Sequence, residues 1–351
     1  MDSLIVASAV GATHSLILTG REKWVKQKFR GAVLGKGDNL FGQLGGERRE
    51  IGLFEPIANL SKEIIAIAAG DTFSMALSAD GEVLTWGENL SGQLGDGTRR
   101  SRSNPGNVEG ISKRVIKIAA GCTHSLALTE EGEVFAWGNN FSGQLGDGTT
   151  QSRNTPKKME NLDKEIVEVS GSFFGSLALT KDGQLWGWGV QGGLSQVVGG
   201  NIQKFLKPKK ISGFNCAIVE IASGYDHSLA LSQEGRLYSW GGNGYGQLGD
   251  GTRNPNEIPT LVKGIHGKAV KVAVSYSTSL VQNEEDEILI WGRDHRTYFG
   301  DIESKAQLSP DTLSGVSPLV SSIVFGPGGR VEDFEQLEEA LRRQVSQIMY
   351  L

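Results

Sequence analysis

Carboxylates, histidines and aromatic rings recur in the corresponding short loops of a repeated sequence in this 351-residue chain. The carboxylates are Asp71 and Asp226, and the histidines are His14, His124 and His227. Such side chains can coordinate a metal ion or recognise a charged group on another molecule. The three histidines stand in three different repeats, each next to a serine. This arrangement favours a structural hydrogen bond over metal ligation.

The other candidates for chemistry give no catalytic arrangement. Asp96, Asp147 and Asp250 each stand in a Gly-Asp-Gly-Thr turn and lack the oxygen-ligand spacing of a calcium loop. We find no nucleophile with a base and an orienting group, no phosphate-binding loop before a helix and no paired cysteine motif. The sequence therefore predicts no metal, no cofactor and no covalent chemistry, and the remaining use of these loops is binding.

The loops belong to an internal repeat. Residues 121–149 read GCTHSLALTEEGEVFAWGNNFSGQLGDGT, and closely related stretches occupy residues 70–98 and 224–252. Weaker copies make up the rest, so that repeat cores start near residues 11, 70, 121, 171, 224 and 275. A fixed period of about 50 residues indicates a propeller or a solenoid.

Each repeat has the composition of four short β-strands, which we name A to D. An apolar run such as residues 115–120 precedes the glycine, and a second run such as 124–128 follows it. A Glu-Gly or Asp-Gly pair then predicts a tight hairpin turn. The third strand ends in Trp-Gly, as at Trp137, and an Asn-x-x-Gly-Gln-Leu-Gly loop leads to the fourth, such as 258–262. Blades of this kind bury both faces only in a ring.

The fold class predicted is therefore an all-β propeller over residues 1–325. Six blades fit the six repeat cores, and seven stay an alternative. A separate C-terminal segment, residues 326–351, predicts an amphipathic α-helix whose apolar side chains follow a helical spacing. That stripe is Phe334, Leu337, Leu341, Val345 and Ile348. We expect this helix to pack on the side or the end of the propeller.

Charge and composition restrict the partners. The net charge of −5 gives no basic field that would attract nucleic acid over the whole surface, so no direct nucleic-acid binding is expected. The two cysteines, Cys122 and Cys216, indicate a reducing compartment. The first residues lead directly into a repeat strand rather than a signal peptide, and no apolar run reaches membrane-spanning length. A cytosolic monomer is expected.

These motifs closely resemble the regulator of chromosome condensation repeat family. The marks of that family are the G-x-x-H-S-L-A-L strand, the Trp-Gly pair and the N-x-x-G-Q-L-G loop. Gly-Gln-Leu-Gly stands here at residues 42–45, 92–95, 143–146 and 246–249. The resemblance covers roughly residues 3–300 and implies the same propeller fold. WD-repeats are shorter, and the regular Gly-Gly doublet of Kelch repeats is absent from this chain.

The resemblance also implies a function. The founding member of the family is a guanine-nucleotide exchange factor for the small GTPase Ran, and acidic and histidine side chains of its A–B loops matter for exchange. By motif match these fall on Asp71, Asp226 and His227. We therefore expect binding to a Ras-superfamily GTPase of the Ran, Rab, Rap or Rho type. Exchange needs no covalent chemistry. The alternative is a non-catalytic adaptor or inhibitor propeller.

Strand alternation places the expected partner-binding face. In an antiparallel blade the A–B and C–D loops emerge on one side and the B–C turns on the other. The residues that vary between repeats in the A–B loops are the site candidates: Asp71, Thr72, Phe73, Cys122, Thr123, Phe173, Phe174, Tyr225, Asp226, His227 and Tyr276. Phe73 and Phe174 have a second interpretation, in which they fill gaps between blades.

Two further segments carry hypotheses. The first repeat has an insertion, residues 20–31, which is either a solvated hairpin or a second partner contact. Its candidate contact residues are basic and aromatic: Trp24, Lys26, Lys28 and Arg30.

The glutamate-rich C-terminal segment resembles secretion signals of effectors that intracellular bacteria inject into host cells. A bacterial effector that imitates a host GTPase regulator, secreted into the host cytosol, is therefore a further hypothesis.

Overall fold

The computed structural model describes residues 5–19, 32–47, 49–160, 162, 164–190, 204–293 and 307–312. Three sequence-based predictions fall outside these residues. They are the inserted contact with Trp24, Lys26, Lys28 and Arg30, the C-terminal helix of residues 326–351, and the resemblance of that segment to secretion signals. In the described part of the chain, no helix is long and apolar enough to cross a membrane.

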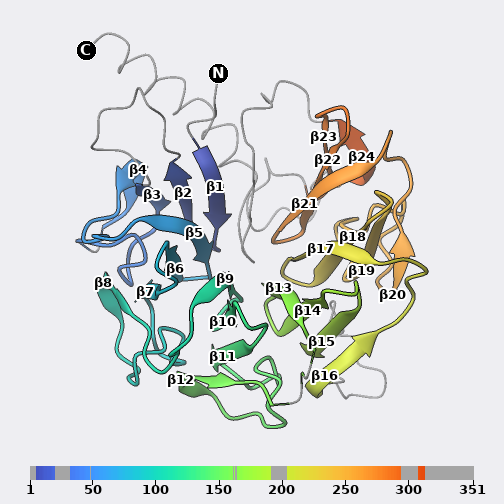
Figure 1. The fold of residues 1–351 in the computed structure, drawn as a ribbon. Coiled ribbons are helices and arrows are strands. Elements are labelled where there is room, and N and C mark those ends of the chain that lie inside the picture. The colour runs from blue at the N-terminus through green and yellow to red at the C-terminus, as the bar shows by residue number, and fades with distance from the viewer. Residues whose placement is uncertain are drawn as a thin grey trace.

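The described residues form six four-stranded antiparallel sheets arranged around a central axis (Figure 1). Blade one is β1 (Ile5–Val10), β2 (His14–Thr19), β3 (Val33–Gly37) and β4 (Ile51–Pro56). Blade two is β5 (Ile64–Ala69), β6 (Phe73–Ser78), β7 (Val83–Gly87) and β8 (Arg102–Asn107). Blade three is β9 (Val115–Ala120), β10 (His124–Thr129), β11 (Val134–Gly138) and β12 (Arg153–Lys158).

Blade four is β13 (Ile166–Gly171), β14 (Gly175–Thr180), β15 (Leu185–Gly189) and β16 (Phe205–Ile211). Blade five is β17 (Ile218–Ser223), β18 (His227–Ser232), β19 (Leu237–Gly241) and β20 (Asn256–Leu261). Blade six is β21 (Ala269–Ser275), β22 (Thr278–Asn283), β23 (Ile288–Gly292) and β24 (Gln307–Thr312). The prediction of an all-β propeller with six blades is confirmed.

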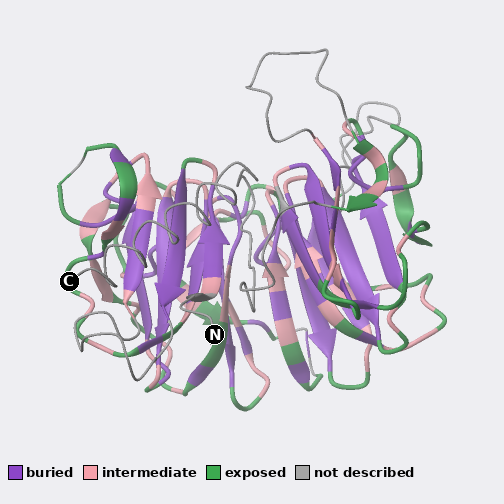
Figure 2. Cartoon of the chain, turned by 90° about the horizontal axis from the view of Figure 1, so that it is seen from above, coloured by how far each residue is buried: buried purple, intermediate pink, exposed green. Residues whose placement is uncertain are grey.

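Burial falls from the inside of each blade to its edge. The second strands, such as β6, β10 and β14, are buried at every residue, whereas the outermost strands, such as β12, are largely exposed. Figure 2 shows the same gradient, with buried strands inside and exposed segments at the periphery. Each sheet thus has apolar side chains on both faces, and neighbouring blades cover them.

Tight turns join the second and third strands as the sequence predicts. Gly81, Gly132, Gly183 and Gly235 all have φ near +80°, and the N–H of each donates to the carbonyl oxygen three residues earlier, as Gly81 does to Ser78. The residues before these glycines do not have positive φ, so each connection is a type I turn followed by a glycine bulge rather than a primed two-residue turn. In blade six the same turn places a non-glycine residue, Asp286, at φ 63°. These turns lie on the side of the propeller opposite to the A–B and C–D loops.

The Trp-Gly pair and the Gly-Gln-Leu-Gly loop form one joint between consecutive blades. The indole N–H of Trp137 donates to the carbonyl oxygen of Gln93 in the blade before it, at 2.9 Å. The same bond links Trp86 to Gln43, Trp188 to Gln144 and Trp291 to Gln247. All these indoles are fully buried. The tryptophans are therefore blade-packing residues, as predicted.

The repeated histidines have structural partners. Nε2 of His14, His124 and His227 lies 2.8, 2.8 and 2.9 Å from the hydroxyl of a serine in the next blade. Burial lowers the pKa of His14 and His124 to about 3, so both rings are neutral at physiological pH. The prediction of a structural hydrogen bond is confirmed.

The buried histidines make the fold sensitive to acid. Unfolded histidine binds a proton below pH 6.5, whereas native His124 stays neutral down to about pH 3, so the free energy of unfolding falls as the pH drops through this window. We compare the free energy of unfolding of His124→Phe with that of wild type at each pH. We expect this difference to favour the variant by about 2–3 kcal/mol more at pH 4 than at pH 7. Phe73 already occupies the same position in blade two. Urea unfolding at pH 7 and pH 4 measures the difference, and an equal effect at both values would contradict it.

Candidate partner-binding face

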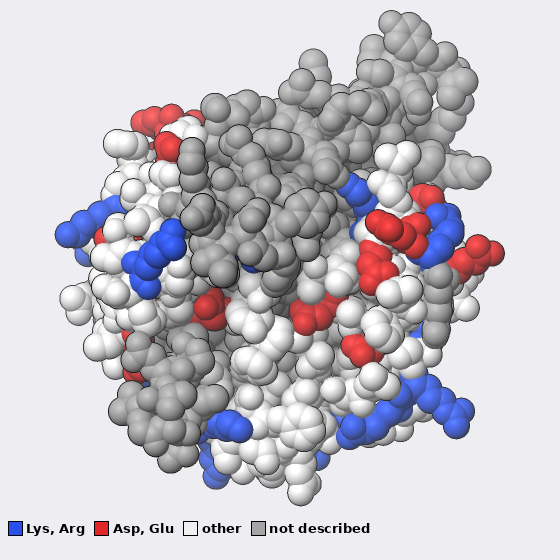
Figure 3. Space-filling view, turned by 180° about the vertical axis from the view of Figure 1, so that it is seen from behind, with Lys and Arg blue, Asp and Glu red and all other residues white. Residues whose placement is uncertain are grey.

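The A–B loops and the first residues of the C–D loops meet on one face of the propeller in all six blades. In each blade the backbone N–H at the start of the C–D loop donates to the carbonyl oxygen of the third A–B residue. The six pairs are Asp38 to Thr13, Glu88 to Thr72, Asn139 to Thr123, Val190 to Phe174, Gly242 to Asp226 and Arg293 to Ser277. Figure 3 shows this face, with acidic side chains near its centre and most basic ones nearer the periphery.

Adjacent A–B loops are also joined to one another. The backbone N–H of Asp71 donates to the carbonyl oxygen of Cys122 at 3.0 Å, and the N–H of Cys122 to that of Ser172 at 3.4 Å. Tyr225 and Tyr276 are linked in the same way at 3.0 Å. The variable residues therefore stand on a backbone that is held from blade to blade, which suits a preorganised binding surface.

Blades two and three contribute a carboxylate cluster. One oxygen of Asp71, Oδ2, accepts a hydrogen bond from the thiol of Cys122. The other, Oδ1, is buried and has no hydrogen-bond partner among the described residues. Burial and the nearby Glu88 carboxylate together raise the pKa of Asp71 to about 6. Glu88 itself accepts a hydrogen bond from Thr72. The cluster is an unsatisfied acceptor for a cation or an N–H donor.

This cluster lowers stability at neutral pH. Because the pKa of Asp71 is raised from 3.8 to about 6, the native state holds the proton more tightly, and the free energy of unfolding falls as the pH rises through this window. Asp71→Asn cannot ionise. We expect it to be about 2–3 kcal/mol more stable relative to wild type at pH 7.5 than at pH 4. Thermal unfolding at both pH values measures this, and a gain of the same size at both would exclude ionisation as its cause.

Blades four to six contribute an aromatic cluster. The ring centroids of Phe173 and Phe174 lie 4.3 Å apart, and those of Phe173 and Tyr225 lie 4.2 Å apart. Tyr225 in turn lies 4.3 Å from Tyr276. Phe174 has 42% of its surface exposed, and the other three are partly buried. Burial raises the pKa of both tyrosine hydroxyls, so the rings are neutral. These residues form one continuous apolar wall.

A second carboxylate borders the aromatic wall. Asp226 Oδ1 accepts a hydrogen bond from Nε2 of Gln247 at 2.9 Å, and its backbone carbonyl accepts from Gly242 at 2.7 Å. A Cβ atom on Gly242 would lie 2.1 Å from Asp226 Oδ2, so only glycine leaves this carboxylate where it stands. The face therefore presents Asp71 and Asp226 on either side of the ring, with aromatic side chains beside Asp226.

Three site candidates, Phe73, Cys122 and His227, are buried, and for Phe73 this agrees with its second interpretation as a residue that fills the gap between blades. Phe73 is 0% exposed and packs in the hydrophobic core between blades two and three. His227 is 1% exposed, and its Nε2 faces Ser279 of blade six. Neither offers surface to a partner, because both are first residues of a second strand and face the adjoining blade. Cys122 is also buried and acts through Asp71. Thr123 is partly exposed.

Sequence reasoning missed two residues of this face, Glu88 and Gly242. Both directly follow a Trp-Gly pair, the position where the C–D loop meets the A–B loop. That position varies between repeats as the A–B residues do, so it carried a signal.

The A–B loop of the fourth repeat is shifted by one residue. Ser172 takes the place of the first glycine, because its backbone N–H donates to the carbonyl oxygen of Gly175, just as the N–H of Gly121 donates to that of His124 in the third repeat.

Comparison with known proteins agrees with this architecture. The model of the RCC1-like domain matches residues 30–328. The human E3 ubiquitin-protein ligase HERC2 is 38% identical over 234 residues, which are 64% of this chain and 5% of HERC2. The mitochondrial RCC1 domain-containing protein RUG3 of Arabidopsis thaliana is 32% identical over 303 residues, 83% of this chain and 66% of RUG3.

The chain thus spans 5% of HERC2 and 66% of RUG3. Among solved structures, Prp20p from Saccharomyces cerevisiae has a TM-score of 0.75 at 23% identity, covering 99% of this chain and 86% of Prp20p. This likeness shows the fold. None of the three proteins bears on the bacterial-effector hypothesis, which stays a prediction from the C-terminal segment.

Proposed function

Because the chain belongs to the RCC1-like domain family, we propose that it is a protein-binding propeller that engages a small Ras-superfamily GTPase. The observation that carries this proposal is the Asp71 carboxyl, largely buried at the ring of A–B loops with one oxygen unpartnered. Such a group is costly unless a partner satisfies it. The aromatic wall beside Asp226, in which Phe174 is exposed and the other rings are partly buried, supplies the apolar contact area of a binding surface.

The proposed action is guanine-nucleotide exchange without covalent chemistry. A GTPase holds its nucleotide through basic and N–H groups around the phosphates. Asp71 and Asp226 would compete for such groups, and a lysine or arginine placed at Asp71 would stabilise its buried carboxylate and lower its pKa. The aromatic wall would hold the GTPase in its nucleotide-free form. Binding energy gained only in that state speeds release.

The known binding of a relative supports this choice. Prp20p has been characterised for its binding to Gsp1p and histones. Binding to Gsp1p is the part of that description on which the GTPase proposal draws. The net charge of −5 and the acidic side chains near the centre of the face disfavour direct contact with nucleic acid. We propose a monomer that acts in the cytosol and does not bind nucleic acid directly.

Release of a fluorescent guanine nucleotide tests the proposal. Purified protein is added to Ran, Rab, Rap and Rho loaded with the labelled nucleotide and an excess of unlabelled nucleotide. We expect acceleration of about tenfold or more on one of the four, since regulators of this kind act on few partners. No acceleration and no binding to any of them would overturn the GTPase proposal.

A second candidate function is a non-catalytic adaptor or inhibitor. The aromatic wall favours it, because rings of this kind are frequent hot spots in interfaces that do no chemistry. It also needs no role for the carboxylates. Tight binding of a GTPase with unchanged nucleotide release would identify this second function and exclude exchange.

A further inference from the structure

Three exposed apolar side chains stand at the same position of the C–D loops in three consecutive blades. Leu40, Leu90 and Phe141 are 65%, 64% and 69% exposed, and each directly follows the asparagine of the Asn-x-x-Gly-Gln-Leu-Gly loop. Blade five has Gly244 there. Single exposed apolar residues are normal, but a repeated set on one face is patterned. We name these three residues the loop arc.

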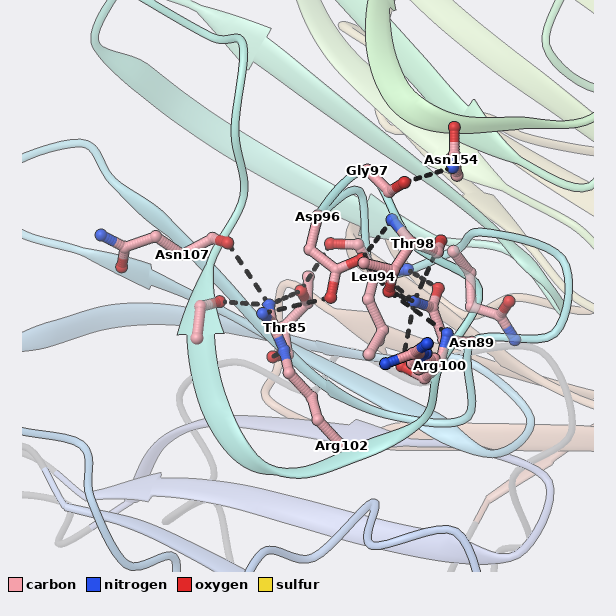
Figure 4. Close-up of polar contacts among 12 residues, drawn as sticks. Thr85, Asn89, Leu94, Asp96, Gly97, Thr98, Arg100, Arg102, Asn107 and Asn154 are labelled. Carbon is pink, nitrogen blue, oxygen red and sulfur yellow. Dashed lines mark hydrogen bonds and ion pairs between the residues drawn. The ribbon is translucent and has the colours of Figure 1, made fainter.

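The loops that carry the arc are rigid. Asn89 is fully buried; its Oδ1 accepts from the N–H of Leu94 at 3.0 Å, and its Nδ2 donates to Asp96, Thr98 and Arg100 (Figure 4). Asn39 and Asn140 are equally buried and bond their own loops in the same way. The exposure of the arc is therefore a fixed property of the folded chain, so a partner would meet preorganised side chains.

The arc extends across the blade junctions. A Cβ atom on Gly42 would lie 2.5 Å from Ser103, and one on Gly92 would lie 2.6 Å from Asn154, both in the outer strand of the next blade. Gly143 approaches Leu206 of blade four in the same way, at 2.8 Å. Each loop thus lies over the neighbouring outer strand, and the three apolar tips follow the curve of blades one to four.

Opposite charges border the arc on its two sides. Asp38 and Glu88 precede the tips of blades one and two by two residues. The Glu88 carboxylate accepts a hydrogen bond from Thr72 of the A–B loop, which lies toward the centre, and the Asp38 carboxylate accepts from the N–H of Leu40 at 3.0 Å, directly beside the tip. Arg99 and Lys204 stand before the outer strands and donate to the carbonyl oxygens of Leu90 and Phe141. Figure 3 shows this division between an acidic centre and a more basic periphery.

We propose that the loop arc docks an amphipathic helix of a protein partner, with basic side chains along the edge that faces the centre of the propeller. A helix presents an apolar stripe and a charged edge at a fixed angle, which matches the apolar tips beside the carboxylates. The acidic centre selects lysine or arginine on that edge. This surface adjoins the carboxylate cluster through Glu88 but includes neither Asp71 nor the aromatic wall, and it does not require the partner to be a GTPase.

A designed peptide tests the arc without knowledge of the partner. The probe is a fluorescent 18-residue helix of leucine, alanine and lysine with a leucine stripe and one lysine edge. A matched peptide carries glutamate in place of lysine. Fluorescence anisotropy compares wild type with the Leu40→Ser/Leu90→Ser/Phe141→Ser variant. The control variant, Leu53→Ser/Ile258→Ser, removes apolar side chains that are 74% and 65% exposed on outer strands.

The lysine peptide is expected to bind wild type and the control variant alike, and the arc variant about tenfold or more weakly. The glutamate peptide should bind wild type weakly. Thermal unfolding checks that both variants fold. The proposal is overturned if wild type shows no saturable binding, if the arc variant binds equally well, or if the two peptides do not differ. These outcomes are independent of any result on nucleotide release.

Discussion

Trp137→Ala is expected to lower the free energy of unfolding by about 3–5 kcal/mol, because it empties the centre of a blade junction. The indole is 0% exposed, and its N–H donates to the Gln93 carbonyl of the preceding blade. A Cβ atom on Gly95 would lie 2.6 Å from the indole nitrogen, so the ring packs directly against a glycine of the preceding blade, which has no side chain to move into the space. Urea unfolding measures the loss.

Trp137→Phe separates packing from the hydrogen bond. The phenyl ring fills most of the site, and the Gln93 carbonyl keeps a donor in the hydroxyl of Ser125 at 2.8 Å. We therefore expect a smaller loss, about 1–2 kcal/mol. Equal losses in the two variants would show that the indole N–H, rather than packing, holds the junction.

Changing Asp71 and Asp226 together to alanine is expected to weaken binding of the GTPase about a hundredfold, since charged pairs that become desolvated in an interface are costly to break. The two carboxylates belong to different blades, so a partner that spans the ring loses both contacts. Titration of the partner that responds in the release assay measures the affinity of the variant and of wild type.

Exposed carboxylates on the opposite side provide the control for this variant. Asp80 and Glu130 lie in the B–C turns and are exposed. Asp80→Ala/Glu130→Ala removes the same charge from the chain, so it reports any effect of net charge alone. We expect this control variant to bind the GTPase as tightly as wild type does. An equal loss in both variants would place the partner elsewhere or make the effect one of long-range charge.

Much of the fold could be predicted from the sequence because the same strand and turn signals recur in several repeats. The Asp-Gly turns, the Trp-Gly strand ends and the buried inner strands all recur about every 50 residues, and each has one local explanation. The histidines were also predictable, since a serine beside each offered a partner. What the sequence did not show was that the partner serine belongs to the next blade.

The candidate site was harder to predict because the alternation of strands within one blade does not show which of its residues the neighbouring blade buries. Phe73 and His227 occupy loop-end positions that look exposed in the sequence, and they are buried by contacts from the adjoining blade. The unpaired oxygen of Asp71 and the restriction at Gly242 also arise from residues far apart in the chain or in separate loops. Residues 20–31 and 313–351 lie outside the described residues, so the partner contact on the insertion and the C-terminal helix stay predictions.

Hydrogen exchange of the protein with and without each nucleotide-free GTPase tests the central claim most directly, because it reports both binding and the face that is used. We expect one GTPase to slow exchange in the A–B loops, at residues 71–73, 122–124 and 225–227, and to leave the B–C turns at 80–82, 131–133 and 234–236 unchanged. Slower exchange confined to the B–C turns, or no change with any of the four GTPases, would contradict it.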